Sequence, residues 1–200
     1  KPSWHAARRW SHLPTIGVGP AGRYRHTLPE IEEHRRARYA RIASAAGATC
    51  VGRSVYRPRG VAAGLPARFV ALNPWSPSRT VRWRGFAALA EALQPPPTNA
   101  FCGPGERAEV LALLGGSVPG VAGLSLPDFA ASLAGYSTFV SNDSGAAHFA
   151  AACGVPVLMV HGSTAPERTG AGEAVELPER LWCQPCYRKT CLWGTPCLDI

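Results

Sequence analysis

The sequence predicts an α/β protein built on one doubly wound parallel sheet, with a short N-terminal segment before it and a cysteine-rich tail after it. From Arg68 onward, apolar runs of about five residues alternate with amphipathic segments of about ten, the pattern of βαβ units. The 200 residues are 46% hydrophobic and 17% charged, which is typical of a globular domain with one core. No window is apolar over the roughly 18 residues that a membrane-spanning helix needs.

The residues before this sheet are predicted to form a separate entry segment. Residues 1–29 contain no acidic residue and no clear hydrophobic period, so we expect only a short strand near Thr15–Val18. Glu30–Ala46 predicts a helix, with acids in its first turn, arginines later and Gly47 after its end, which is the order that the helix dipole and C-cap preference favour. Cys50–Ala67 contains three Arg, two Pro and three Gly and predicts an extended loop.

The elements of the sheet then follow in order. Phe69–Leu72 is the first apolar run and predicts a strand, and Pro95–Pro97 ends the helix after it. The remaining predicted elements are the helix Gly85–Leu93, the strand Asn99–Cys102, the helix Glu106–Leu114, a strand near Val118–Val121, the helix Pro127–Ala134, the strand Thr138–Ser141, the helix Ala146–Cys153 and the strand Val155–Val160. Right-handed crossovers would arrange these strands in one Rossmann-like sheet.

The net charge of +8 is concentrated in the N-terminal third of the chain. Residues 1–60 contain 12 basic and 3 acidic residues, whereas residues 61–200 contain 9 and 10. A basic surface favours polyanions such as nucleic acid, anionic lipid headgroups or a phosphorylated glycolipid. The alternative is that these residues only solvate the outer face of a helix, as four arginines of the Glu30–Ala46 helix could: Arg35, Arg36, Arg38 and Arg41.

The loop after the strand Thr138–Ser141 carries the most informative chemistry. A strand end runs into Asn, Asp, Ser and Gly, and a helix begins at once, so that free backbone N–H groups and the positive end of a helix dipole face one place. This arrangement suits a pyrophosphate. Gly145 permits close approach of an anion, Ser144 can donate a hydroxyl, and His148 lies one turn along. Taken alone, Ser141 to Ser144 could equally form only a helix N-cap.

Two further loops at the same predicted edge carry similar residues. The loop Asn73–Trp83 combines the hydroxyls of Ser76 and Ser78 with Arg79 and Arg82, a mixture that phosphate recognition uses, although a solvated Pro/Ser loop would look the same. In the loop Gly103–Glu106, a carboxylate at a helix start could accept hydrogen bonds from ribose hydroxyls or merely complement the dipole. Three such loops at one edge predict a nucleotide site.

These residues also carry a family resemblance. The stretch Val140-Ser-Asn-Asp-Ser-Gly-Ala-Ala-His148 and its continuation to Thr164 resemble the signature of glycosyltransferase family 9, the ADP-heptose:lipopolysaccharide heptosyltransferases. The loop at Asn73–Trp83 resembles the family's hydroxyl-rich loop ending in Lys-x-Trp. The remaining matches are Gly103–Glu106, the helix at Leu126–Leu133 and the Cys-x-Pro-Cys-x4-Cys-x5-Cys tail. The resemblance covers roughly residues 30–200.

The resemblance implies the C-terminal, donor-binding half of a two-domain GT-B enzyme that transfers heptose or a related sugar from an ADP-sugar to a lipopolysaccharide core or lipid A-linked acceptor. Ser76, Ser144 and Gly145 would bind the donor diphosphate, and Asp143 and His148 would line the same pocket. The expected domains are a remnant of the acceptor domain (1–29), a linker helix and loop (30–66), the Rossmann-like nucleotide-sugar domain (67–182) and the cysteine-rich tail (183–200). The protein is expected in the cytoplasm, with peripheral binding to the inner membrane left open.

The sequence departs from the family's pattern in two ways. The lysine position of Lys-x-Trp holds Val81, so that its charge must come from Arg79 or Arg82. The resemblance implies that Glu106 contacts the ribose. The acidic general base of the family lies in the acceptor domain, and it is expected outside this chain. Of that domain, the chain is expected to keep only a possible last strand near Ile16. Because the chain starts with Lys rather than Met, we expect a truncated or processed product that binds donor without efficient turnover. The catalytic residues are therefore unknown.

Seven cysteines in a cytoplasmic protein argue against a disulfide framework. Cys50, Cys102 and Cys153 lie in apolar contexts and are expected to be buried. The tail cysteines are numerous enough for a tetrahedral zinc site, although their second pair lacks the usual tight spacing: Cys183, Cys186, Cys191 and Cys197. Packing or redox-sensitive thiols are the alternatives, and the resemblance implies no required cofactor.

Two other functions remain open from the sequence. A non-catalytic module could bind nucleic acid or anionic membrane through the basic third, with a zinc-bound tail, although the resemblance leads us to expect no nucleic-acid partner. A related GT-B enzyme could use a UDP-sugar, because the residues of the phosphate-binding loops do not indicate which base or which sugar the donor carries. The sequence says nothing of the oligomeric state.

Overall fold

The computed structural model describes residues 16–18, 26–29, 31–49, 69–93, 98–115, 118, 120–121, 123–171 and 180–199. The chain divides into two compact units, Lys1–Gly52 and Arg53–Ile200. None of the described helices combines the length and the apolarity needed to cross a membrane.

The first unit contains two short parallel strands and a helix. The strand β1 (Ile16–Val18) was predicted, and β2 (His26–Leu28), which pairs with it, was not. The helix α2 (Arg35–Ala45) begins later than predicted, and its first turn holds no acidic residue. The predicted loop at Cys50–Ala67 lies outside the described residues.

The prediction of acids in the first turn of α2 is wrong because Glu33 precedes the helix and binds arginines of its later turns. The Arg41 guanidinium donates to the Glu33 carboxylate at 2.6 Å, and this bond lowers the pKa of the carboxyl. The ring of His34 caps the helix by accepting from the Arg36 backbone N–H at 3.1 Å. Gly47 follows the helix with a φ of +85°, as the C-cap prediction requires. Part of the arginine set is therefore used in intramolecular pairing.

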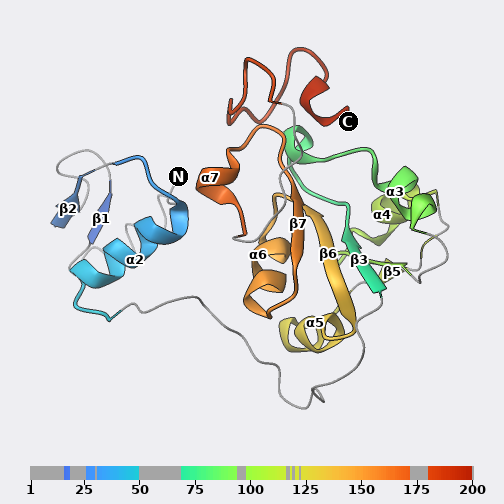
Figure 1. The fold of residues 1–200 in the computed structure, drawn as a ribbon, viewed down its shortest axis with the longest axis horizontal. Coiled ribbons are helices and arrows are strands. Elements are labelled where there is room, and N and C mark those ends of the chain that lie inside the picture. Colours follow the sequence, from blue (N-terminus) through green and yellow to red (C-terminus); the bar gives the residue numbers. More distant parts are fainter. Residues whose placement is uncertain are drawn as a thin grey trace. The chain divides into compact units, whose positions relative to one another are not determined.

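The second unit is built on a five-stranded parallel sheet with the order β5-β4-β3-β6-β7, which confirms the predicted doubly wound fold (Figure 1). The strands are β3 (Phe69–Asn73), β4 (Thr98–Phe101), β5 (Gly120–Val121), β6 (Tyr136–Asn142) and β7 (Val157–Val160). The helices between them are α3 (Phe86–Ala92), α4 (Arg107–Leu113), α5 (Leu126–Leu133) and α6 (Gly145–Ala152). The sequence did not predict the short helix α7 (Pro166–Thr169) or the two 3-10 turns at Arg79–Val81 and Pro196–Leu198.

Alternate residues of each strand point to opposite faces of the sheet, and each face carries its own core. Ala71 and Phe139 belong to a cluster with residues of α5 and α6. Their neighbours Leu72 and Val140 belong to a second cluster with residues of α3 and α4. The helices consequently cover both faces, so the carboxyl ends of the strands are where a ligand can approach.

The start of α5 offers a direct test of how its cap contributes to stability. Ser125 accepts from the Asp128 backbone N–H at 3.3 Å and donates to the Asp128 carboxylate at 2.6 Å. We expect Ser125→Ala to lower the free energy of unfolding in urea by about 1 kcal/mol, because one N–H of the first turn loses its acceptor. Ser125→Thr keeps the hydroxyl and serves as the control. Equal losses in both variants would contradict the capping role.

Candidate functional site

The site lies where the strand order reverses. From β3 the chain continues outward through β4 to β5, and it then returns to the other side of β3 to form β6 and β7. Loops that leave the carboxyl ends of β3 and β6 therefore diverge, and in parallel α/β sheets this divergence leaves a crevice that binds ligands. The loops are residues 74–85 after β3 and Asp143–Ser144 after β6.

Ser144 is the N-cap of α6. Its backbone is extended, with φ −146° and ψ 160°, and its hydroxyl accepts from the Ala147 N–H at 3.3 Å. The interpretation of this serine as a cap is thus confirmed. One serine satisfies one of the four N–H groups that a helix start leaves without an intrahelical partner, so the same turn can also receive an anion.

Gly145, the first residue of α6, borders open space. It is exposed, and a Cβ built on it would meet no atom within 4 Å other than those of its chain neighbours and of the adjoining backbone of α6. Glycine here is not required by backbone conformation, since its φ is not positive. The space in front of the helix's positive end is thus free to be occupied by a group that approaches the backbone closely.

A buried amide fixes the Ser144 hydroxyl relative to the sheet. The Asn73 Oδ1 accepts from the hydroxyls of Ser141 at 3.1 Å and Ser144 at 3.2 Å, and those two hydroxyls lie 2.9 Å apart. The Asn73 amide nitrogen donates to the Phe101 carbonyl at 3.0 Å. Asn73 therefore joins the ends of β3, β4 and β6 under the crevice.

A second buried amide holds the loop after β3. Asn142, fully buried at the end of β6, donates to the Pro74 carbonyl at 2.8 Å and accepts from the Trp83 backbone N–H at 2.9 Å. Both ends of the loop are thus tied to β6. Asn73 and Asn142 were not among the predicted site residues. The signal that could have found them is a carboxamide at the last position of each of two neighbouring strands.

The loop after β3 uses one of its two predicted phosphate-binding arginines internally. The Arg82 Nε donates to the Ser76 carbonyl at 2.9 Å, and the guanidinium lies over the Trp75 ring at 5.2 Å and 3.9 Å from the Glu109 carboxylate. The Ser76 side chain is buried and accepts from the Ser78 N–H at 3.3 Å. Arg82 therefore stabilises the loop.

The 3-10 turn of the same loop decides which side chains can reach a ligand. Val81, at the position where the family pattern has lysine, is only 6% exposed. Arg79 in the same turn is exposed. Of these two positions, only Arg79 offers a side chain to solvent.

Glu106 accepts a hydrogen bond from within its own loop. Its carboxylate accepts a hydrogen bond from the Gly103 backbone N–H at 2.6 Å. A Cβ built on Gly103 would lie 2.9 Å from the same carboxylate oxygen. Glu106 precedes α4, as predicted, and remains half-exposed. One carboxylate oxygen thus positions the loop after β4.

Asp143 connects the site to the loop after β7. Its carboxylate accepts from the Thr169 hydroxyl at 2.8 Å and lies 4.0 Å from the His161 Nδ1. His148 is exposed on α6, and its backbone N–H bonds to the Ser144 carbonyl at 3.5 Å. Asp143 and His148 are predicted site residues, whereas His161 and Thr169, which lie after the last strand of the sheet, were not predicted.

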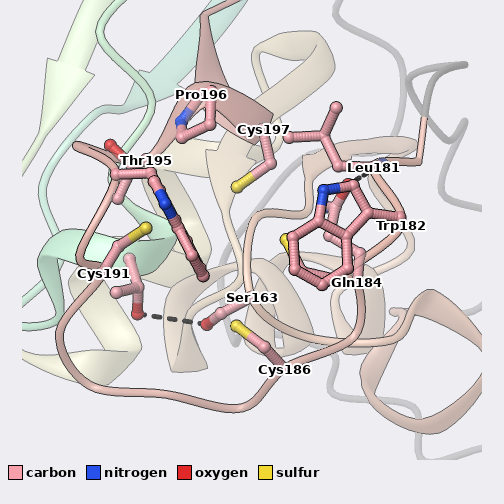
Figure 2. A pocket seen from close by; sticks show the side chains of 12 residues that line it. Ser163, Leu181, Trp182, Gln184, Cys186, Cys191, Thr195, Pro196 and Cys197 are labelled. Carbon is pink, nitrogen blue, oxygen red and sulfur yellow. Dashed lines mark hydrogen bonds between the residues drawn. The ribbon is translucent and has the colours of Figure 1, made fainter.

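The tail forms a second feature, which we call the cysteine pocket. It is a cavity of about 340 Å³ whose walls include the four tail cysteines and two tryptophans: Cys183, Cys186, Cys191, Cys197, Trp182 and Trp193 (Figure 2). Burial is the largest cause that raises the pKa of the Cys197 thiol, and the other three tail thiols add to the rise. Within the described residues, no three His, Cys, Asp or Glu side chains are arranged to hold a metal ion as they stand.

The other described cysteines differ from the prediction in degree. Cys102 and Cys153 are half-buried rather than buried, and each packs against one of the two cores. Burial is the largest cause that raises the pKa of both thiols. Cys50 lies outside the described residues.

Comparison with known proteins gives consistent matches. Residues 30–195 match the model of glycosyltransferase family 9 (heptosyltransferase). A 72-residue stretch, 35% of the chain, is 43% identical to Lipopolysaccharide heptosyltransferase 1 of Pseudomonas aeruginosa, of which it covers 20%.

Solved structures with a similar fold extend these matches. E. coli heptosyltransferase WaaC with ADP aligns with a TM-score of 0.59 and 20% identity over 78% of this chain and 54% of its own. A glycosyl transferase family 9 protein from Veillonella parvula aligns with a TM-score of 0.62 and 20% identity over 83% of this chain and 56% of its own. The chain spans about half the length of these two structures.

Proposed function

The chain belongs to glycosyltransferase family 9, and from this premise we propose that its parallel-sheet unit binds the diphosphate of a nucleotide-sugar donor at the start of α6. The observation that carries the proposal is the open space in front of Gly145, beside the fixed hydroxyl of Ser144. A diphosphate there would accept hydrogen bonds from the first backbone N–H groups of α6 and interact with the positive end of its dipole.

The other predicted site residues then take distinct roles in the proposal. The exposed Arg79 would supply the charge that the buried Val81 cannot. Arg82, Ser76 and Glu106 would act by shaping the loops that surround the donor, because the Arg82 guanidinium, the Ser76 hydroxyl and the Glu106 carboxylate already bind groups of their own loops.

Asp143 and His148 complete the proposed pocket. Asp143 is held by Thr169 and would orient the turn, and His148 would face the donor from the exposed side of α6.

The site's chemistry suits stabilisation of a leaving group. Glycosyl transfer from a nucleotide sugar breaks the bond between the anomeric carbon and the diphosphate oxygen, and negative charge develops on the diphosphate. Preorganised N–H groups, the Ser144 hydroxyl and the Arg79 guanidinium would stabilise that charge. The base that deprotonates the acceptor hydroxyl is proposed to lie in an acceptor-binding half of the whole enzyme.

The names of the relatives support a specific donor and acceptor. The Pseudomonas relative is named for lipopolysaccharide heptosyl transfer, and the E. coli structure contains ADP. We accordingly propose an ADP-sugar, with heptose or a related sugar, as donor and a lipopolysaccharide core or lipid A-linked acceptor. The reaction would take place in the cytoplasm, at the inner surface of the inner membrane.

Calorimetric titration with ADP tests the donor site. We expect Gly145→Leu to weaken ADP binding by at least about tenfold, because the new side chain starts from a Cβ that borders open space and would compete with the diphosphate for that space. Ala88→Leu, which adds a similar side chain on an exposed position of α3, is the matched control and should bind as the original chain does.

Three outcomes decide between the donor alternatives. Binding of ADP that is lost only in Gly145→Leu supports the proposal. Tighter binding of UDP than of ADP would support the proposed diphosphate site but would assign a UDP-sugar, not an ADP-sugar, as the donor. Absence of binding of either nucleotide to folded protein, or equal binding to both variants, would overturn the site.

A further inference from the structure

The tail has little apolar burial to hold it in place. Among its described residues, 180–199, only Thr195 and Leu198 are buried. Trp182 is 85% exposed, Leu192 80% and Trp193 58%. Ordering a backbone costs roughly 1–2 kcal/mol per residue, and small loop-rich segments with little core usually depend on a disulfide or a metal ion. A further stabilising link is therefore expected here.

The turns of the tail bring its cysteines to one cavity. Tyr187, directly after Cys186, has a φ of +52°, and Gly194 and Thr195, between Cys191 and Cys197, have φ values of +74° and +68°. These left-handed residues are positioned to change the chain direction once after the first pair of cysteines and once within the second pair. All four tail cysteines line the cysteine pocket (Figure 2).

The first half of this pocket is anchored to the sheet unit. Gln184, between the first two cysteines, donates to the Gly162 carbonyl at 2.6 Å and accepts from the Leu181 N–H at 2.7 Å. The Tyr187 N–H bonds to the Ser163 carbonyl at 2.8 Å, and the Thr80 hydroxyl donates to the Arg188 carbonyl at 2.6 Å.

The second half is joined to the first at the rim of the pocket. The Trp182 and Trp193 rings meet edge to face with centroids 5.7 Å apart, and both are exposed. Both indoles line the cysteine pocket, one from each half of the tail. Cysteine side chains from the same two halves of the tail also line this pocket.

We propose that the cysteine pocket binds one zinc ion through the four tail thiolates, as a structural site that is independent of the proposed donor site. Zinc prefers tetrahedral thiolate coordination, with Zn–S distances of about 2.3 Å. Each coordinating thiol releases its proton to solvent, and four thiolates around Zn²⁺ leave a net charge of −2.

Binding must draw the loops inward. The four thiols line the cavity without the spacing of a metal site. Contraction of the cavity would bring them together and would change the packing of Trp182 against Trp193. The proposal thus predicts a change in tryptophan fluorescence along with metal binding.

Metal analysis of the full chain tests the site. We expect one zinc per chain by mass spectrometry of the purified protein. After zinc removal under reducing conditions, Co²⁺ titration should give the absorption bands of tetrahedral thiolate coordination together with a fluorescence change. Cys186→Ser and Cys197→Ser should weaken Co²⁺ binding by at least about tenfold. Cys102→Ser and Cys153→Ser, which change cysteines of the sheet unit, are the matched controls and should bind as the original chain does.

Other outcomes would overturn the inference. Tail thiols that all react freely with an alkylating reagent in the presence of excess Zn²⁺ would show that no metal protects them. Disulfides within the tail of protein kept in reducing, zinc-containing buffer would assign the link to covalent pairing. Loss of ADP binding alone would leave the zinc site standing, because the two sites are measured separately.

Discussion

Replacing Asn142 with leucine should lower the free energy of unfolding by about 2–5 kcal/mol, because it leaves the Pro74 carbonyl and the Trp83 N–H without their hydrogen-bond partner. Asn142 is fully buried, so water cannot readily replace the lost bonds. Urea unfolding followed by circular dichroism measures the change. Because these two bonds hold both ends of the loop after β3, ADP binding should weaken as well.

Asn99→Leu is the matched control for this experiment. Asn99 also carries a carboxamide on a strand, but it is only half-buried, and its amide donates to the Tyr136 hydroxyl at 2.6 Å. Its replacement should cost about 1 kcal/mol. If Asn142→Leu were no more destabilising than Asn99→Leu, the amide of Asn142 would not be what ties the loop to β6.

Replacing Gly162 with alanine should also be strongly destabilising. A Cβ at this position would lie 2.3 Å from the Thr80 carbonyl oxygen and 3.0 Å from the Leu198 side chain. The first contact is with backbone, so the loop itself must shift, and overpacking of this kind costs roughly 1–3 kcal/mol or more. The Ser163 N–H, which donates to the same Thr80 carbonyl at 3.0 Å, would be displaced too.

The displaced loop also carries the contacts of the tail, so the effect should extend beyond global stability. We expect Gly162→Ala to show increased protease cleavage in the tail at temperatures below global unfolding. Gly135→Ala is the control, because its Cβ would meet only the Ser132 carbonyl, at an ordinary 3.9 Å. Its change should stay within about 0.5 kcal/mol. Equal protease resistance of both variants would contradict the dependence of the tail on this loop.

The sheet could be predicted from the sequence because its signal is local. Strands buried on both faces appear as short apolar runs, and five such runs with helices between them specify a doubly wound fold. The cap at Ser144 and the positive φ of Gly47 follow from local chemistry in the same way.

The internal partners of the site could not be predicted, because they depend on contacts between distant segments. Whether Arg82 faces a ligand or its own loop depends on Trp75 and on Glu109 of α4. The hydrophobic pattern of the sequence does not predict these contacts. The sequence predicts acids in the first turn of α2 because the helix dipole favours negative charge there. In the structure, the Glu33 carboxylate precedes the helix and binds Arg41 instead. Donor binding by any of the named residues stays a prediction.

The pairing of β3 with β6 has a consequence for synthesis of the protein. Phe69–Asn73 finds one neighbour in Thr98–Phe101 but its other neighbour only in Tyr136–Asn142, after three helices have been made. Until then, one edge of the strand presents unpaired backbone groups and apolar side chains, which invite association with other nascent chains. Ribosome-bound intermediates stalled before Tyr136 should accordingly be the stage at which a chaperone is most needed.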